Sequence, residues 1–472
     1  MIMTDQDVDG THIKGLVMNF LSKWPSLMEI EGFITSLLTP IVKVRKGKQI
    51  KNFYTLPDYD AWISATANSS SWKSKYYKGL GTSTPSEAKD YFRDFKVIQY
   101  HWDETSENSL DMAFNKTRAD NRKDWLRGFD PTQVLDLNQS FVTIKDFIDL
   151  DLIHFSNEDN HRNIPSLIDG FKPGQRKIYF CSERRNLKTE IRVSQLSGYV
   201  SEKGAYHHGE ASLNGTIVGM AQNFCGSNNI NLLEPIGQFG SRLKGGKDFA
   251  QSRYLNTHLS SLANIIFNKL DNPIYENNVD DGVVVEPTFY MPIIPMILAN
   301  GTNGIGTGWS TNVPQYNPID IVANLSLLMN NEGPVEMMPW FRGFCGKVEK
   351  YNDNHWITRG KYKLVGNNKV EVSELPIGVW TDKYKALLEE GAIIVDVRSP
   401  AEFSGGNIEN SLNIPVGELM NNLEYLKDKN QTIITCCASG MRSGAAKQLL
   451  VAKGYTHVIN GGGWRSLNSK IK

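Results

Sequence analysis

The chain has 472 residues, of which 40% are hydrophobic, and it contains 10 tryptophans. This length exceeds what one hydrophobic core supports, so we expect three or four domains, and the composition excludes a mostly disordered chain. Lys and Arg number 51, as do Asp and Glu, so the formal net charge is zero. A uniformly basic protein is therefore excluded, and any nucleic-acid surface must be local.

The cysteines indicate a reducing compartment, because their spacing forms no framework of pairs. No signal peptide is recognisable, and the longest apolar run, near residues 291–298, is interrupted by prolines. We therefore expect a soluble intracellular protein with no membrane partner. The five cysteines are Cys181, Cys225, Cys345, Cys436 and Cys437.

Residues 1–99 alternate β-rich and helical patterns, which predicts an α/β unit. Apolar residues from Ile13 to Leu21 recur at helical spacing, and residues 33–44 predict a strand with a turn at Pro40. Residues from about 100 to 151 are charged and helix-prone, which is typical of a connector.

The second half of the chain changes pattern twice. Residues 161–278 are helical with glycine-rich interruptions, and strand-like apolar runs with prolines begin near Val283. A last unit begins near Lys385, where residues 392–396 predict a buried strand. No internal repeat is visible.

Three carboxylates stand at every second position near the start, at Asp5, Asp7 and Asp9. On an extended strand they would share one face, where a hard cation such as Mg²⁺ would offset their repulsion. Gly10 would then permit a sharp turn into the following helix. On spacing alone, an acidic turn without metal is about equally compatible with this pattern. The chain opens directly on this motif, so we expect that an upstream portion is missing.

The string from Met3 to Gly15 resembles the second half of the TOPRIM motif of eukaryotic-type topoisomerase II. The family also uses an earlier glutamate in a Glu-Gly-Asp-Ser context, and no such segment precedes Asp5, so the resemblance implies an incomplete metal site. Lys78-Gly-Leu-Gly-Thr-Ser83 matches a second TOPRIM-associated signature. There the glycines would let amides approach an anion, and Lys78 would add positive charge against DNA.

Residues 162–177 resemble the entry to the winged-helix domain of the same family. The segments that follow in family order are residues 206–210, 221–229, 235–240, 245–248 and 252–254. The resemblance covers about residues 1–384. It implies a type IIA DNA topoisomerase that cleaves and religates double-stranded DNA through a 5′-phosphotyrosyl intermediate.

The resemblance makes Tyr254 the nucleophile. A phenol is a weak nucleophile at neutral pH, and adjacent cations favour phenolate and stabilise a phosphorane-like transition state. The resemblance makes Arg253 the transition-state stabiliser and Asp169 the holder of a cation. Mg²⁺ on Asp5 and Asp7 would assist the leaving 3′-oxygen. The residues implied to support the same phosphate are Arg162, Lys172, Arg176 and, nearby, His208.

The resemblance also implies how DNA is gripped and bent. Arg122 and Lys123 resemble a DNA-contacting helix, and Lys172 and Tyr206 are further candidates. Ile305 matches a residue that wedges between base pairs, although a tight glycine-rich turn with one apolar side chain is the alternative. Because the family's metal face and tyrosine come from different protomers, the resemblance implies a homodimer. The full family uses ATP, but the chain shows no nucleotide-binding domain, so we do not expect strand passage by this chain alone.

The end of the chain resembles a different family, the single-domain rhodaneses. The resemblance rests on residues 395–403, 413–415, 437–443 and 461–464. A short loop from Cys437 to Arg442 that opens a helix would aim amides and Arg442 at an anion and favour a thiolate or persulfide. The resemblance implies that Cys437 carries sulfane sulfur, whereas we expect Cys436 to be buried. The topoisomerase-like and rhodanese-like parts are joined either by a genuine gene fusion or in a chimera of gene fragments. We favour the chimera.

The fold class we predict is mixed α/β and α+β in a multidomain chain. The expected domains are a partial TOPRIM (1–105), a connector (106–155), a winged-helix domain with the catalytic tyrosine (156–280), a tower-like domain (281–384) and a rhodanese-like domain (385–472). Two alternatives to topoisomerase activity stay open: a catalytically incomplete DNA-binding fragment, and sulfurtransferase activity of the tail. If the source is eukaryotic or viral, the resemblance implies the nucleus or a viral replication site.

Overall fold

The computed structural model describes residues 1–77, 79–93, 95–137, 139, 141–280, 282–366, 369–389 and 392–471. The chain divides into two compact units. The first unit comprises residues 1–177, 274–279 and 286–314, and the second comprises residues 178–273, 280–285 and 315–472. Both contain helices and sheets, so the predicted mixed multidomain class is confirmed. The finer division into five domains stays a prediction.

The first unit is built around a three-stranded sheet in the order β1-β5-β6. β1 pairs antiparallel with β5, and β5 pairs parallel with β6. Helices cover this sheet and share one core, in which Met18 and Phe147 are fully buried. The elements are α1 (Val8–Leu21), α2 (Pro25–Met28), β1 (Thr35–Leu37), β5 (Val97–His101), α5 (Ser106–Phe114), α6 (Ala119–Arg127), β6 (Phe141–Thr143), α7 (Ile144–Phe147), the π-helical turn η3 (Ile148–Leu152) and α8 (Ile153–Asn163).

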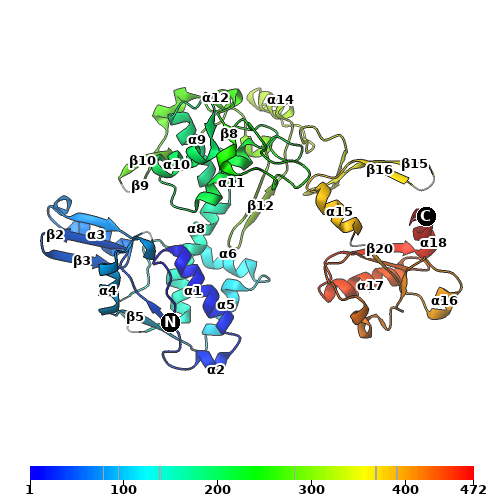
Figure 1. The fold of residues 1–472 in the computed structure, drawn as a ribbon, viewed down its shortest axis with the longest axis horizontal. Helices are drawn as coiled ribbons and strands as arrows, with labels where there is room; N and C mark the ends of the chain where they lie inside the picture. The colour runs from blue at the N-terminus through cyan, green and yellow to red at the C-terminus, as the bar shows by residue number, and fades with distance from the viewer. Residues whose placement is uncertain are drawn as a thin grey trace. The chain divides into compact units, whose positions relative to one another are not determined.

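A second sheet of the first unit has the order β3-β2-β4. Val42 and Val44 alternate inward along β2 and form a small core with Phe53 and Tyr59, and Figure 1 shows α3 beside this sheet. The strand predicted over residues 33–44 is divided at Pro40 into two strands, β1 and β2, which belong to different sheets. The elements are β2 (Val42–Lys46), β3 (Gln49–Phe53), α3 (Leu56–Ala65), η1 (Ser69–Ser71), β4 (Lys73–Tyr76), η2 (Leu80–Thr82) and α4 (Pro85–Arg93).

Helices α9, α10 and α11 precede η4 and β8, and β8 pairs antiparallel with β7. Val193 and Leu196 of α10 and Leu213 of α11 are fully buried. The elements are α9 (Pro173–Arg184), β7 (Ile191–Arg192), α10 (Val193–Lys203), α11 (Glu210–Ala221), η4 (Ser252–Tyr254), β8 (Asn256–Thr257), α12 (Ser261–Ile266) and η5 (Lys269–Ile274). The predicted helical character of residues 161–278 is therefore confirmed.

Between residues 277 and 374 the chain forms mainly strands, in agreement with the strand-like apolar runs predicted from Val283 onward. β11 pairs with β12, β13 with β14, and β15 with β16, all antiparallel. The elements are β9 (Asn277–Asp280), β10 (Val283–Pro287), α13 (Met296–Ala299), β11 (Thr302–Ile305), β12 (Ser310–Val313), α14 (Pro318–Met329), β13 (Lys347–Asn352), β14 (His355–Arg359), β15 (Lys361–Val365) and β16 (Lys369–Glu374).

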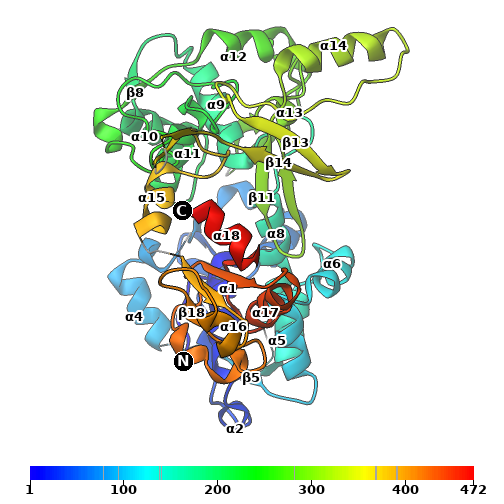
Figure 2. The same ribbon diagram turned by 90° about the vertical axis from the view of Figure 1, so that its right-hand side faces the viewer.

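The C-terminal part of the second unit contains a four-stranded parallel sheet in the order β18-β17-β19-β20. The predicted buried strand is β17, in which Val395 and Asp396 are fully buried. α17 packs along β19 and β20 (Figure 2). The elements are α15 (Thr381–Glu389), β17 (Ile393–Asp396), α16 (Pro400–Ser404), β18 (Leu412–Asn413), η6 (Leu419–Asn421), η7 (Leu423–Tyr425), β19 (Ile433–Cys437), α17 (Met441–Ala452), β20 (Val458–Gly463) and α18 (Trp464–Ile471). None of the helices in the described part of the chain has the length and apolar character needed to cross a bilayer.

Candidate functional site

The acidic residues near the start do not form the extended strand that their spacing predicts. Asp7 is the N-cap of α1 and accepts a hydrogen bond from the Gly10 amide at 2.7 Å, while Asp9 lies in the first helical turn. An aspartate at either place satisfies or complements the free amides of a helix start, and this preference overrides the alternating pattern. The expectation of one strand face carrying three carboxylates is therefore wrong, as is that of a turn at Gly10.

Asp9 forms an ion pair with Arg162 of the same unit. Arg162, at the end of α8, donates hydrogen bonds from Nη1 and Nη2 to the two Asp9 carboxylate oxygens at 3.1 and 2.9 Å. Phe155 lies beneath this pair: its ring stacks on His12 at 4.0 Å, and the Arg162 guanidinium lies 5.7 Å from the same ring. Burial chiefly lowers the pKa of His12, and the nearby Arg162 adds to this. Sequence reasoning missed both His12 and the Asp9–Arg162 contact.

Asp5 lies against the second TOPRIM-like segment. A Cβ atom on Gly79 would stand 3.1 Å from Asp5 Oδ2, and one on Gly10 would stand 1.9 Å from the Asp5 carbonyl oxygen. Both glycines are therefore required by close packing around Asp5. Lys78, a predicted DNA contact in this segment, lies outside the described residues.

The carboxylates fit Mg²⁺ only in part. Asp5 and Asp7 supply the hard oxygen donors that Mg²⁺ prefers, although Asp7 Oδ1 also caps α1. Asp9 already pairs with Arg162. Over the described ranges, no group of three or more His, Cys, Asp or Glu side chains is arranged to hold a metal ion. The donor set therefore fits an ion that keeps much of its water shell.

Asp169 and Arg176 form a second, buried ion pair in the first unit. Arg176 Nε donates to Asp169 Oδ2 at 2.8 Å, and Nη2 donates to Oδ1 at 3.1 Å and to the Phe171 carbonyl oxygen. The amides of Phe171 and Tyr290 also donate to Asp169, which is fully buried. Lys172 beside them is half-buried, and burial lowers its pKa. The prediction that Asp169 holds a cation agrees with this contact.

Tyr254 is the last residue of η4, and only Leu255 separates it from β8. Its side chain is 69% exposed, whereas Leu255 and Thr257, which follow it, are fully buried. The Tyr254 amide donates to the Gln251 carbonyl oxygen at 2.9 Å, which closes the turn. The Arg253 guanidinium carbon lies 5.1 Å from the centre of the Tyr254 ring. The buried residues Leu255 and Thr257 therefore anchor the backbone, while the Tyr254 phenol is exposed beside the Arg253 guanidinium.

The second unit also contains the predicted residues Tyr206 and His208. Their rings meet edge to face at 5.4 Å, and the Tyr206 hydroxyl contacts Ser212 Oγ at 3.4 Å. The neighbouring His207 instead pairs with Asp280 at 2.9 Å. Tyr254, Arg253, Tyr206 and His208 thus belong to the second unit, whereas the predicted residues Arg162, Asp169, Lys172 and Arg176 belong to the first.

Ile305 ends β11 at the tip of a hairpin, opposite Ser310, and is 75% exposed. The glycines on either side of it have no room for a side chain. A Cβ on Gly304 would stand 2.3 Å from the Asn163 carbonyl oxygen, and one on Gly306 would stand 2.2 Å from Asn160 Oδ1. Close packing of the hairpin against α8 therefore leaves Ile305 as the projecting apolar side chain.

The two predicted DNA contacts of α6, Arg122 and Lys123, already have partners within the chain. Arg122 Nη1 donates to the carbonyl oxygens of Met112 and Asn115 at 3.0 and 2.7 Å. Lys123 pairs with Asp120 at 2.8 Å, an exposed contact that a phosphate can displace at small cost. Of the two, Lys123 is the more available to meet a DNA backbone.

Cys437 ends β19 and faces a loop of amide donors. Its Sγ accepts hydrogen bonds from the Gly440 amide at 3.0 Å and from Ser443 Oγ at 3.5 Å. Burial opposes the thiolate, but hydrogen bonds from Ser443, Gly440 and Ser439 lower the pKa of Cys437 to about 7. Cys436 is buried as predicted, and burial together with the Asp396 charge raises its pKa to about 12.

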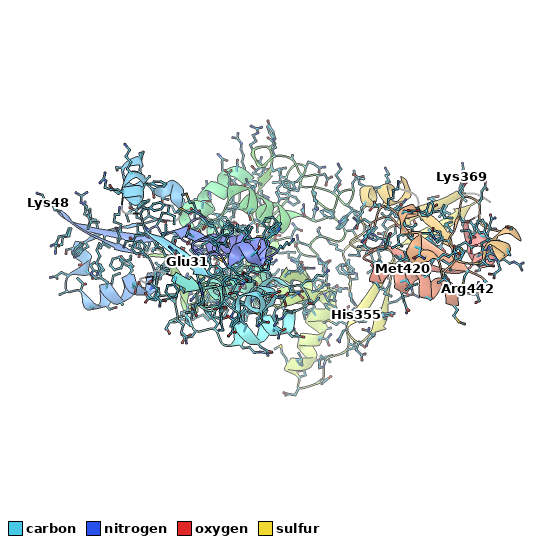
Figure 3. All side chains as sticks on the ribbon, turned by 90° about the horizontal axis from the view of Figure 1, so that it is seen from below. Glu31, Lys48, His355, Lys369, Met420 and Arg442 are labelled. Carbon is cyan, nitrogen blue, oxygen red and sulfur yellow. The ribbon has the colours of Figure 1, made fainter. Side chains whose placement is uncertain are left out.

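Arg442 on α17 lies in the same domain (Figure 3). It does not point freely at an anion site, because Nη1 and Nη2 donate to the two Glu402 carboxylate oxygens, each at 2.8 Å. Glu402 is in turn fixed by the capping box of Ser399 at the start of α16. No sequence pattern indicated Glu402, because it carries charge opposite to an anion-binding role.

Comparisons with known proteins match three parts of the chain. The DNA gyrase/topoisomerase IV family matches residues 162–405, just over half of the chain. The C-terminal associated domain of TOPRIM matches residues 37–160, and the rhodanese-like domain matches residues 381–470.

Curated relatives include DNA topoisomerase 2 of Meyerozyma guilliermondii, which is 50% identical over 83% of this chain and 28% of its own length. DNA topoisomerase 2 of Saccharomyces cerevisiae is 48% identical over 82% of this chain and 28% of its own length. The chain therefore spans less than a third of these relatives. The solved structure of the Plasmodium falciparum topoisomerase II DNA-binding, cleavage and re-ligation domain is 47% identical, with a TM-score of 0.68, over 82% of this chain and 54% of that chain.

Proposed function

The chain belongs to the DNA gyrase/topoisomerase IV family, and from this membership we propose that it cleaves and reseals double-stranded DNA with Tyr254 as the nucleophile. The observation that carries the proposal is the exposure of Tyr254, whose side chain is 69% exposed while Leu255 beside it is fully buried. A nucleophile for a duplex must project from the protein and must also be held in place. Tyr254 meets both requirements.

The reaction exchanges one phosphodiester for another. The Tyr254 oxygen bonds to a DNA phosphorus while the bond from phosphorus to the 3′-oxygen breaks, and that oxygen leaves as a hydroxyl. The phenol proton is released, and resealing reverses both changes. Arg253, adjacent to Tyr254, can bind the phosphate oxygens in two-point fashion as their charge grows. The ester retains the energy of the original bond, so resealing needs no external energy source.

The residues of the first unit divide between contact and support. Lys172 and Arg162 are the cations of this unit that we assign to the phosphate, and His208 is a separate candidate in the second unit. Arg176 is buried against Asp169, so we assign both to positioning the Lys172 segment rather than to direct contact. Asp5 and Asp7 would hold Mg²⁺, whose positive charge when bound would stabilise the negative charge that develops on the leaving 3′-oxygen.

DNA binding is proposed for a further set of residues in the two units. Ile305 would enter a base step and bend the duplex, and Lys123, Tyr206, Arg122 and Lys78 would contact the backbone. The assembly proposed is a homodimer, since two tyrosines are needed to cut two strands.

The proposal is tested by trapping the covalent complex. Supercoiled plasmid is incubated with the protein and Mg²⁺, and the mixture is then denatured. The DNA that stays attached to the denatured protein is measured, because only a covalent link survives this treatment. We expect covalent DNA from the parent chain and none from Tyr254→Phe. If the two proteins retain DNA equally, and only by salt-sensitive binding, the chain is a DNA-binding fragment without cleavage activity.

A second proposed activity is sulfur transfer by the C-terminal domain. The supporting observation is that Cys437 accepts hydrogen bonds from the loop at the start of α17 and has a pKa of about 7. A thiolate there can take the outer sulfur of thiosulfate as a persulfide, releasing sulfite, and pass that sulfur to cyanide. We expect Cys437→Ser to abolish thiocyanate formation. Formation at the parent rate by this variant would rule the assignment out.

A further inference from the structure

Two cysteines that no proposed activity uses lie close to Gly343 in the second unit. A Cβ atom built on Gly343 would stand 4.0 Å from the Cβ of Cys225, and the Cys345 thiol lies 3.7 Å from the Gly343 carbonyl oxygen. Cβ atoms of bridged cysteines are typically separated by about 3.5–4.5 Å. The Cβ position of Gly343, two residues before Cys345, lies at that separation from Cys225, so the turn that carries Cys345 passes directly beside Cys225.

The two segments are held together by polar contacts. Asn229 Oδ1 accepts a hydrogen bond from the Arg342 amide at 2.8 Å, and Arg342 Nη2 donates to the Asn223 carbonyl oxygen at 3.1 Å. The amide of Phe344 donates to the Phe341 carbonyl oxygen at 3.0 Å, which closes the turn. The segment after α11 is thus held against the turn that carries Cys345 by residues on either side of Cys225.

An ion pair lies beside the thiols. Arg242 pairs with Glu374, and Glu374 Oε2 accepts a hydrogen bond from the Cys345 amide at 3.4 Å. Burial chiefly raises the pKa of Cys225, while the Arg242 charge lowers it and the charges of Glu374 and Cys345 raise it. Cys345 is exposed and Cys225 is half-buried.

We propose that Cys225 and Cys345 form a reversible disulfide when the protein meets a peroxide. The exposed thiol reacts first: the Cys345 sulfur attacks the peroxide O–O bond, takes one oxygen as a sulfenic acid and releases an alcohol or water. The Cys225 thiol then attacks the Cys345 sulfur and displaces that oxygen as water. Two thiols lose two protons and two electrons in total, and the peroxide is reduced by the same two electrons.

The bridge joins the segment after α11 to the turn before β13. It therefore closes a loop of the chain that contains Tyr254 and Ile305. A cross-link that closes so long a loop stabilises mainly by restricting the unfolded chain. The oxidised protein should accordingly resist unfolding better than the reduced one. This inference rests on the two cysteines alone and does not depend on cleavage activity.

The test uses the full chain treated with hydrogen peroxide, followed by alkylation of free thiols and peptide mapping under non-reducing conditions. We expect a peptide containing Cys225 linked to one containing Cys345, which dithiothreitol separates. The unfolding temperature should rise by several degrees on oxidation and return on reduction. Cys437→Ser removes the other reactive thiol from the map and should leave the link intact.

Two single variants complete the design. Cys345→Ser should abolish both the linked peptide and the temperature shift, whereas Cys225→Ser should leave Cys345 as a sulfenic acid that dimedone labels. The proposal is overturned if Cys225 and Cys345 in the peroxide-treated parent chain are alkylated as completely as before treatment. Oxidation of Cys345 to a sulfinic acid with no linked peptide would overturn it equally.

Discussion

Arg162 donates two hydrogen bonds to the carboxylate of Asp9, which lies 153 positions earlier in the chain. This contact ties the start of α1 to the end of α8. It also removes one of three regularly spaced carboxylates from the set available to a metal, and it orients Arg162. The acidic motif therefore does two things: Asp9 holds a cation, and Asp5 and Asp7 are left as oxygen donors.

Asp9→Asn should weaken that link with little loss of stability. The Asp9 side chain is 47% exposed, and partly exposed ion pairs contribute about 0.2–1 kcal/mol. We expect the free energy of unfolding to fall by at most about 1 kcal/mol, while covalent DNA formation falls clearly because Arg162 is no longer oriented. Urea denaturation and the plasmid trapping assay measure the two effects. A large loss of stability without loss of cleavage would contradict this role.

Asp169→Asn, in contrast to Asp9→Asn, should greatly lower the free energy of unfolding. Asp169 is fully buried and Arg176 is 5% exposed, so the variant leaves a buried guanidinium without its counter-charge. Breaking one partner of such a pair typically costs about 3–5 kcal/mol. The comparison with Asp9→Asn, made by urea denaturation under identical conditions, separates a structural pair from an orienting one. Equal and small costs would show that Asp169 is less enclosed than the structure indicates.

Ile305→Ala should reduce DNA bending without affecting stability. The side chain is 75% exposed, so its removal leaves no cavity, but an alanine cannot hold a base step apart. Energy transfer between dyes at the ends of a short duplex measures the bend. Ile319→Ala is a matched control because Ile319 is equally exposed, at 75%, in α14. If both variants bend DNA like the parent chain, Ile305 is only the tip of a hairpin.

The Cys437 thiol should react with iodoacetamide in a pH-dependent way. Its pKa of about 7 means that the thiolate fraction, and hence the rate, rises through neutral pH and levels off about one unit higher. Ser443→Ala removes a hydrogen bond that favours the thiolate, so it should move the midpoint to higher pH. Mass spectrometry of the alkylated peptide separates Cys437 from Cys436, whose pKa of about 12 keeps it unreactive. An unchanged midpoint in Ser443→Ala would contradict the role of this hydrogen bond.

Those features that depend on local pattern could be predicted from the sequence. The apolar run at 393–396 is β17, and the helical spacing from Ile13 to Leu21 lies within α1. The prediction failed at Asp5–Asp9. The alternating pattern favours a strand, but Asp7 caps the start of α1 and Asp9 lies in its first turn, where both carboxylates stabilise the free amides of the helix. Only the order of the motifs singled out Tyr254 as a candidate nucleophile, because no local property of the sequence distinguishes that tyrosine from a surface one.

Contacts between distant segments could not be predicted in this way. The approach of Cys225 to Cys345, the pairing of Arg442 with Glu402 and the stacking of His12 on Phe155 all join residues that have no shared periodicity. Such contacts depend on how hairpins and helices pack, which is set by many weak interactions at once. The interpretation changed most at Arg442, which the sequence predicts to face a bound anionic ligand and which instead pairs with the chain's own Glu402.

The most direct test of the central claim is to identify the amino acid that carries DNA after cleavage. The trapped complex is digested with nuclease and protease, and the peptide bearing a residual nucleotide is sequenced by mass spectrometry. We predict a single modified residue, Tyr254, joined through its phenolic oxygen to a 5′-phosphate. A nucleotide found on any other side chain, or a Tyr254 peptide unmodified while DNA is cut, would contradict the assignment.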